Sequence, residues 1–335
     1  MTRTAAHFYI AALLLAGASA AAPAAALDAS RSDVRDFVNR VGRRDGLDPA
    51  WVADTIAKAQ SQPRIIDLMS RPAERVKPWH EYRDHFLTEE RIAAGVRFWT
   101  EHRDLLDAVS RYSGVSPSVI VGILGVETYF GRITGNFRVL DALATLAFDY
   151  PPRASYFRSE LEQFLLLSRE EDLPPESLRG SYAGAMGYPQ FMPRSFRAFA
   201  VDGDGDGRRD LWSNWHDVVA SIANYLVSHG WRAGEPVTAP AELWDADADG
   251  LVAGSLDLDD TVQGLRDKGV EFNTTLPGDA PALFIDVAGD GGPELRVGFH
   301  NFSVITRYNH SVLYALAVTD LGRAVESRLP AEGGS

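Results

Sequence analysis

The segment VIVGILGVETYFG, residues 119–131, places a single charged residue, Glu127, inside one of the most apolar stretches of the chain. Ser116 and Pro117, just before it, are typical of the first positions of a helix, and the glycine at its end is a natural stop. The sequence therefore predicts a helix over residues 117–130. Any fold of this chain has to place that apolar helix in a core and still accommodate the carboxylate.

Glu127 shares one face of the predicted helix with aliphatic side chains. Those at helical spacing before it are Ile120, Ile123 and Leu124. Burial against them disfavours the ionised carboxylate, which raises its pKa and prepares it to act as a general acid near neutral pH. A second interpretation is that Glu127, close to the helix end, reaches water or pairs with Arg132. Helical spacing alone favours that second interpretation.

The composition bounds the class of protein. The chain has 335 residues, 45% of them hydrophobic, so it can bury the core of one large domain or of roughly two to three small ones. Its formal net charge is -13 and its pI is near 5.1. This charge argues against nucleic-acid binding, because binding to phosphates needs a concentration of Lys and Arg.

The start of the chain has the layout of a secretory signal peptide over residues 1–26, with one arginine, an apolar run and Ala-x-Ala patterns. The alternative is an uncleaved anchor, because the apolar run is almost long enough to span a bilayer. No second run of that length follows, and the absence of cysteine excludes disulfides and a lipid-bearing cysteine. We expect a soluble periplasmic protein with no membrane span after removal of the signal.

The hydrophobic pattern predicts an α+β protein that is mainly helical. The predicted parts are a signal peptide at 1–26, a helical N-terminal domain at 27–93, a core at 94–234, a small inserted β-rich domain at 235–299 and a C-terminal return to the core at 300–328. Further helices are predicted over 154–171 and 215–229, and strands over 282–287 and 294–299. Asp48 and Thr88 are candidate helix starts.

Two other segments are unusual in composition. SYAGAMGYPQFMPRSF, residues 181–196, has small residues and two prolines in place of a clean period, which is typical of a closely packed, functionally shaped loop. RYNHSVLY, residues 307–314, gathers aromatic and amide groups that can stack on and hydrogen-bond to sugars. The alternative for its tyrosines is ordinary core packing.

Taken in order, several motifs resemble one family. They are GVETYFGR, the LDALATLAFDYPPRASYF run, SYAGAMGYPQFMP, an aspartate-rich loop, SIANYL and RYNHS, and they cover about residues 30–325. This set resembles the lytic murein transglycosylases of the B type, glycoside hydrolase family 103. The resemblance implies a lysozyme-like catalytic domain with a helical N-terminal domain and a small β domain. It also implies cleavage of the MurNAc–GlcNAc β-1,4 bond of peptidoglycan strands without water, which leaves a 1,6-anhydro ring.

The resemblance also implies roles for individual residues. Glu127 matches the catalytic acid of the family, and Ser181 matches the serine beside it. The residues that match the lining of the saccharide cleft are Tyr82, Gln190, Tyr225, Tyr308, Asn309 and Tyr314. Where the family often has two arginines this chain has Pro152 and Arg153, so only Arg153 is transferred. Since most glycosidases use two carboxylates and the motif offers one, Glu127 is expected to act first as acid and then as base.

The segment DGDGDGRRDLWS, residues 202–213, has the spacing of an EF-hand calcium loop. The ligands predicted from that spacing are Asp202, Asp204, Asp206 and Asp210, with the backbone carbonyl of Arg208. Position 12 is Ser213, and the resemblance implies that Asp217 supplies the missing carboxylate. We expect a structural Ca²⁺, and the alternative is an Asp-Gly turn without an ion. A second run, DADADG at residues 245–250, lacks the later acids and is interpreted as a solvated turn.

The sequence leaves two rivals to the lytic transglycosylase. One is a hydrolytic muramidase, which needs a second catalytic carboxylate that no motif provides. The other is a non-catalytic, calcium-stabilised protein that binds peptidoglycan. Since no metal-hydrolase or nucleotide motif is present, no cofactor for catalysis is expected.

Overall fold

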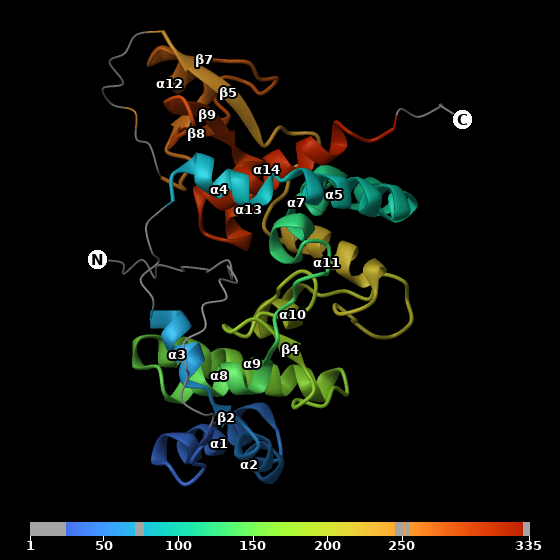
Figure 1. Ribbon diagram of the computed structural model, residues 1–335, viewed down its shortest axis with the longest axis vertical. Helices are drawn as coiled ribbons and strands as arrows, with labels where there is room; N and C mark the ends of the chain where they lie inside the picture. The colour runs from blue at the N-terminus through green and yellow to red at the C-terminus, as the bar shows by residue number, and fades with distance from the viewer. Residues whose placement is uncertain (1–24, 71–76, 245–250, 252–254, 331–335) are drawn as a thin grey trace. The chain divides into compact units, whose positions relative to one another are not determined.

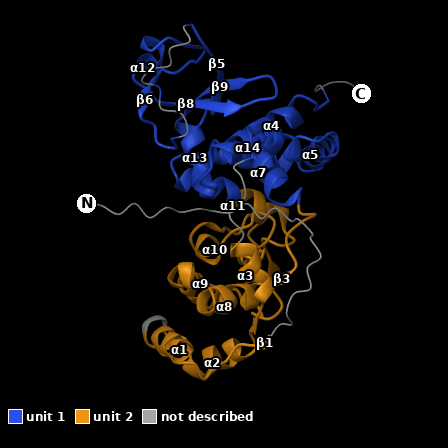
Figure 2. Ribbon diagram, turned by 60° about the vertical axis from the view of Figure 1, so that its left-hand side comes forward, with its two compact units in different colours: residues 1–11, 76–130, 222–335 blue, residues 12–75, 131–221 orange. Residues whose placement is uncertain are grey.

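A computed structural model describes residues 25–70, 77–244, 251 and 255–330 (Figure 1). Residues 1–24 of the predicted signal peptide and the second aspartate run at 245–250 lie outside the described residues. The chain forms two compact units (Figure 2). Among the described residues, the first unit contains those of 77–130 and 222–330, and the second contains 25–70 and 131–221.

The first unit contains one apolar helix, α7 (Pro117–Thr128), that is buried along most of its length. Its other helices outside the sheet region are α4 (Trp79–Phe86), α5 (Glu89–Glu101), α6 (Arg103–Ser113), α13 (His300–Tyr308) and α14 (Val312–Glu326). Nine of the twelve residues of α7 are buried, because the helix is apolar on nearly every face and has α14 and α5 packed against it. Ser116 does not cap it as predicted, since its hydroxyl bonds to that of Ser118 at 2.6 Å.

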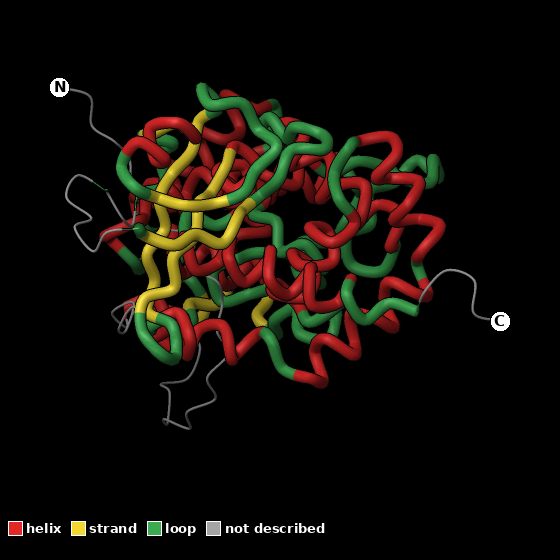
Figure 3. The backbone as a smooth tube through the Cα atoms, turned by 90° about the horizontal axis from the view of Figure 1, so that it is seen from above, coloured by secondary structure: helices red, strands yellow, loops and turns green. Residues whose placement is uncertain are grey.

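The first unit also carries a five-stranded antiparallel sheet in the order β6-β8-β9-β5-β7. Strands are drawn in yellow in Figure 3. Its strands are β5 (Thr238–Leu243), β6 (Asp260–Thr261), β7 (Val270–Phe272), β8 (Pro281–Ala288) and β9 (Pro293–Phe299). The register pairs Phe284 with Val297, and both side chains lie in a core with α12 (Val262–Asp267). Strands β8 and β9 confirm the two strands predicted at 282–287 and 294–299.

The second unit is also mainly helical. Its helices are α1 (Ser32–Asp45), α2 (Pro49–Ala57), α3 (Pro63–Ser70), α8 (Val139–Phe148), α9 (Ala154–Glu170) and α10 (Pro193–Phe199), with a 3-10 turn at Pro151–Arg153. This unit also has two short antiparallel strand pairs. Strand β1 (Ala25–Ala26) pairs with β2 (Gln60–Ser61), and β3 (Phe137–Arg138) pairs with β4 (Arg179–Gly180). Every residue of α8 is buried, so α8 forms the centre of this unit.

Several predicted helix boundaries are confirmed. Asp48 accepts the N–H of Ala50 at the start of α2, and Thr88 accepts that of Arg91 at the start of α5. Helix α9 ends one residue before the predicted 171, and α11 (Trp215–Ser228) ends one residue before 229. Helix α11 contains the second of the two points at which the chain passes from the second unit to the first.

No single described helix is both long and apolar enough to cross a membrane. The helices Arg103–Ser113 and Pro117–Thr128, bent by 117° at the break between them, pass that test only when they are taken together.

Candidate active site

Glu127 lies in the last turn of α7 and is half-buried. The hydroxyl of Tyr314, on α14, donates a hydrogen bond to its Oε1 at 2.7 Å. Burial raises the pKa of Glu127 to about 7, although the Tyr314 hydrogen bond opposes the rise by stabilising the carboxylate. Near neutral pH the side chain therefore exists in both the protonated and the ionised form.

The pairing of Glu127 with Tyr314 depends on the close approach of α7 and α14. A Cβ atom on Gly122 would lie 2.1 Å from the carbonyl oxygen of Val318, and one on Gly322 would lie 2.1 Å from that of Ser118. Only glycine at both positions allows this packing. Sequence reasoning missed both residues, although an isolated glycine inside a helical pattern is the signal that points to such a contact.

Three of the predicted cleft tyrosines lie together in the first unit. The ring centroids of Tyr308 and Tyr314 are 6.4 Å apart and nearly parallel, and those of Tyr225 and Tyr308 are 4.8 Å apart. The Tyr225 hydroxyl donates to the carbonyl of Arg307 at 2.6 Å. Burial first, and then the charge of Glu127, raise the pKa values of Tyr308 and Tyr314 well above the usual range. Both hydroxyls therefore stay protonated near neutral pH.

Two more of the predicted residues lie in the same unit. Tyr82, on α4, packs its ring against Phe86 at 5.1 Å, and burial followed by the charge of Glu127 raises its pKa. Asn309, directly after α13, is buried. Its Oδ1 has no hydrogen-bond donor among the residues that the structure describes. An unsatisfied buried acceptor costs free energy, so this oxygen is suited to receive a donor from a ligand.

The backbone just after Glu127 is strained. Tyr129 and Phe130 have φ values of 51° and 57°, a left-handed conformation that is costly for residues with a side chain. The predicted helix therefore ends two residues early, at Thr128.

Side chains of α5 hold this left-handed turn. The guanidinium of Arg91 lies 4.8 Å from the ring centroid of Tyr129, and Phe98 stacks on Phe130 at 5.5 Å. Gly95 leaves room for the Phe130 ring, because a Cβ there would lie 2.9 Å from it. Sequence reasoning missed Arg91, since nothing in its spacing indicates a contact with residues near 129.

Ser181 belongs to the second unit and is buried. Its hydroxyl oxygen accepts the backbone N–H groups of Ala183 at 3.3 Å and Ala185 at 3.0 Å. The hydroxyl proton remains available for donation, because an oxygen that accepts two bonds still carries its own hydrogen. The loop predicted at 181–196 thus places a serine in a fixed turn.

Gln190 and Arg153 are also in the second unit. Gln190 has a φ of 51°, and its side-chain amide donates to the carbonyls of Gly187 at 2.9 Å and Thr134 at 3.2 Å. Arg153 lies 4.7 Å from the ring centroid of Tyr156. The Gln190 amide nitrogen therefore fixes its own loop, and its Oε1 is the atom left for a ligand.

The aspartate loop gathers three carboxylates. Oxygen atoms of Asp202, Asp204 and Asp217 all lie within 4.8 Å of one another. Asp217 is fully buried, and its burial together with the charges of the other two raises its pKa. Three carboxylates at this separation repel one another unless a cation lies between them, so the donor set fits a hard divalent cation such as Ca²⁺. Asp217 closes the group in place of residue 213.

The other two predicted carboxylate ligands, Asp206 and Asp210, accept backbone N–H groups, as the carboxylates of the group of three also do. Asp210 accepts the N–H groups of Trp212 at 2.8 Å and Ser213 at 3.0 Å, and Asp206 accepts that of Arg208 at 2.9 Å. Among the described residues neither carboxylate belongs to the group of three. The role predicted for the backbone carbonyl of Arg208, as a calcium ligand, stays a prediction.

Comparisons with known proteins identify the family of the chain. The model of the transglycosylase SLT domain matches residues 29–323. Membrane-bound lytic murein transglycosylase B of Escherichia coli K12 is 39% identical over 306 residues, which are 89% of this chain and 83% of that protein.

Solved structures are similar over the same length. Catenated lytic transglycosylase SltB1 from Pseudomonas aeruginosa has a TM-score of 0.86 and 46% identity, covering 89% of this chain and 98% of its own. The Escherichia coli lytic transglycosylase Slt35 in complex with calcium has a TM-score of 0.82 and 37% identity, covering 91% of this chain and 96% of its own. SltB3 from Pseudomonas aeruginosa in complex with NAG-NAM-pentapeptide has a TM-score of 0.78 and 31% identity, covering 90% of this chain and 79% of its own.

These matches confirm both the family and the mainly helical, lysozyme-like α+β fold predicted from the motifs. The chain belongs to the transglycosylase SLT domain family and, within it, to the lytic murein transglycosylases of the B type.

Proposed function

We propose that this protein cleaves the MurNAc–GlcNAc β-1,4 bond of peptidoglycan without water, and that Glu127 serves as acid and then as base. The observation that carries the proposal is a half-buried glutamate with a pKa of about 7 beside the Tyr314 hydroxyl. A group with that pKa gives up and takes back a proton with little cost near neutral pH. Family membership supports the same reaction.

In the first step, protonated Glu127 gives its proton to the glycosidic oxygen as the bond from that oxygen to C1 of MurNAc breaks. The GlcNAc leaves with a free hydroxyl, and the carbonyl oxygen of the N-acetyl group on MurNAc stabilises the positive charge at C1. The Tyr314 hydroxyl donates to the carboxylate that remains, which lowers the cost of the negative charge.

In the second step, the Glu127 carboxylate takes the proton of the C6 hydroxyl while O6 bonds to C1. This closes the 1,6-anhydro ring and returns Glu127 to its acid form. One carboxyl group is enough for the cycle, since the nucleophile comes from the sugar itself and no water needs activation.

The other predicted residues hold the sugars in this proposal. The orphaned Oδ1 of Asn309 suits an amide N–H of the substrate. The rings of Tyr82 and Tyr308 offer stacking surfaces, and the buried Tyr225 packs against Tyr308. We assign Ser181, Gln190 and Arg153 to saccharide binding from the family match. The serine hydroxyl is fixed by its backbone bonds and has a proton to donate.

The aspartate loop holds a structural Ca²⁺ in this proposal. Its support is the group formed by Asp202, Asp204 and Asp217, together with the calcium complex of the similar Slt35. The ion neutralises the repulsion among the carboxylates and stabilises the loop. The signal peptide, the periplasmic location and the domain boundaries derived from the sequence belong to the same proposal.

The test is a digest of purified peptidoglycan sacculi by the protein and by its Glu127→Gln variant, with the released muropeptides measured by mass spectrometry. We expect 1,6-anhydro products, lighter by one water than hydrolysis products, from the wild type only. Reducing-end products would instead identify a muramidase. Binding to sacculi without products from either protein would identify a non-catalytic wall-binding protein.

A further inference from the structure

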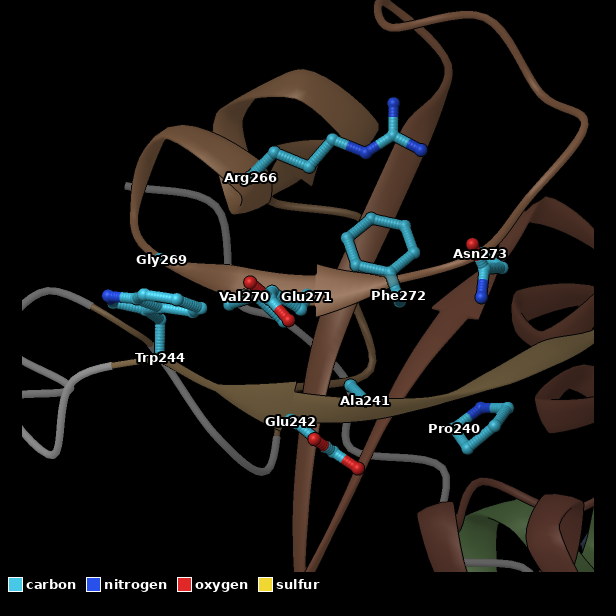
Figure 4. Close-up of a pocket in the computed structure, with 10 residues that line it drawn as sticks. All are labelled: Pro240, Ala241, Glu242, Trp244, Arg266, Gly269, Val270, Glu271, Phe272 and Asn273. Atoms are coloured by element: carbon cyan, nitrogen blue, oxygen red, sulfur yellow. The ribbon is translucent and has the colours of Figure 1, made fainter.

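A second candidate site lies at the edge of the five-stranded sheet, where strands β5 and β7 border a hollow of about 770 Å³. Strand β7 is the last strand of the sheet, so the hollow opens beside an edge. The lining includes Glu242 on β5 and Trp244 directly after this strand. It also includes Gly269 just before β7 and Glu271 on β7 (Figure 4).

The register of the two strands places the charged residues together. Glu242 is directly opposite Glu271, and directly opposite residues of an antiparallel pair point to the same face of the sheet. Trp244 lies two residues after Glu242 and shares that face. Its N–H bonds to the carbonyl of Gly269 at 3.1 Å. A Cβ atom on Gly269 would meet nothing within 4 Å.

This face carries negative charge that the described residues do not neutralise. Like charges directly opposite each other destabilise a sheet, and neither Glu242 nor Glu271 has an ion-pair partner within the part of the chain that the structure describes. The guanidinium of Arg266 lies over the ring of Phe272 at 5.2 Å (Figure 4). Lys268, the other nearby cation, bonds to Asp260 at 2.5 Å.

Trp244 adds an open aromatic surface to this charge. Its side chain is 81% exposed, which is unusual for the largest apolar side chain, since burial of its ring is favourable. The face therefore combines two features that favour a cation. The ring face attracts a positive group, and two carboxylates accept its hydrogen bonds.

We propose that the face formed by Glu242, Glu271 and Trp244 binds a primary ammonium group of the peptide part of peptidoglycan. A stem peptide that is not cross-linked presents such a group on its diamino acid. An ammonium has three donors, so it can bond to both carboxylates while it lies against the indole. This inference rests on the proposed function, because it takes the wall polymer as the ligand, and it adds an anchor outside the Glu127 cleft. A neutral sugar would contact the indole but would leave the two carboxylates repelling each other.

The test uses protein that carries Glu127→Gln, which binds sacculi without cleaving them. Its binding is measured by co-sedimentation with native sacculi and with sacculi whose free amino groups have been acetylated. We expect affinity about 3- to 10-fold lower for the acetylated sacculi, the size of one cation–π contact with one exposed charge pair. The added pair Glu242→Gln and Glu271→Gln should lose the same factor on native sacculi and should no longer respond to acetylation.

A matched control changes two other exposed glutamates, Glu90 and Glu101 of α5, to glutamine. It alters the net charge equally and should keep both the affinity and the response to acetylation. The same response in all variants would mean only general repulsion by the acetylated wall and would overturn the proposal. Loss of binding through Trp244→Ala alone, without any effect of acetylation, would indicate sugar stacking and would also overturn it.

Failure of this inference is separable from failure of the proposed function. The formation of 1,6-anhydro products by protein with Glu127 intact tests the reaction alone. If those products form while acetylation and the paired glutamine variant leave binding unchanged, only the ammonium site is refuted.

Discussion

Removal of the Tyr314 hydroxyl should move the pH dependence of the reaction upward. In Tyr314→Phe the carboxylate of Glu127 loses the donor at 2.7 Å, while the ring still fills its buried position. That hydrogen bond stabilises the ionised form and holds the pKa below the value that burial alone would produce. The variant should therefore keep Glu127 protonated to a higher pH.

The size of the effect follows from the hydrogen bond. A bond to a charged group contributes about 1.5 to 3 kcal/mol, and about 1.4 kcal/mol corresponds to one pKa unit. The pKa of Glu127, about 7 in the wild type, should rise by about 1 to 2 units. In a plot of activity against pH, activity falls on the alkaline side as the acid form of Glu127 ionises. This alkaline limb should move to higher pH by the same amount as the pKa.

The assay is the release of soluble muropeptides from sacculi between pH 5 and pH 10, with kcat/KM determined at each pH. Tyr225→Phe is the matched control, because the Tyr225 hydroxyl donates to the Arg307 carbonyl at 2.6 Å and not to Glu127. Its alkaline limb should stay in place. An alkaline limb for Tyr314→Phe that is unchanged, or that moves to lower pH, would refute the assigned role of this hydrogen bond.

Three further outcomes follow from the structure. The pKa of Glu127 is about 7 in the folded protein, against an ordinary value of 4.5, so ionisation of this group lowers the folding stability as the pH rises from 4.5 to 7 and above. Glu127→Gln should therefore stabilise the protein by about 2 to 3 kcal/mol at pH 8 and by almost nothing at pH 4, measured by urea unfolding. An equal gain at both pH values would show that ionisation of Glu127 is not the cause. Ca²⁺ at a hundredfold excess over its Kd should stabilise the wild type by about 3 kcal/mol in thermal unfolding, and Asp204→Asn should lose most of that gain. A Tm that does not change when Ca²⁺ is added would indicate that the aspartate loop is a turn without an ion. Gly122→Ala should destabilise the fold by about 2 kcal/mol or more and lower the activity, since its Cβ would lie 2.1 Å from the Val318 carbonyl oxygen. The control Gly291→Ala has open space around the new Cβ, so its stability and activity should equal those of the wild type within experimental error.

Much of the fold could be predicted because the relevant signals are local. A proline after Ser116, caps at Asp48 and Thr88, and alternating residues in the two central strands act over a few positions. The structure places these elements within one or two residues of the predicted bounds, except that Ser116 does not act as a side-chain cap. The family could be predicted because its motifs are long and occur in order.

The parts that could not be predicted depend on contacts between distant segments. Gly122 and Val318 touch across almost two hundred positions of the chain, and helical periodicity says nothing about which helix meets which. The left-handed turn at Tyr129 is held by Arg91 from another helix. Asp210 lies outside the group of three carboxylates and accepts hydrogen bonds from its own turn, an arrangement that the EF-hand spacing does not reveal.

The central claim is that one carboxyl group breaks the glycan strand without water. The most direct test is a digest of sacculi in water enriched in ¹⁸O, with the new ends measured by mass spectrometry. The account predicts anhydro ends that contain no ¹⁸O, in amounts that fall to background for Glu127→Gln. Reducing ends that carry ¹⁸O would show that water attacks C1, and would contradict the account.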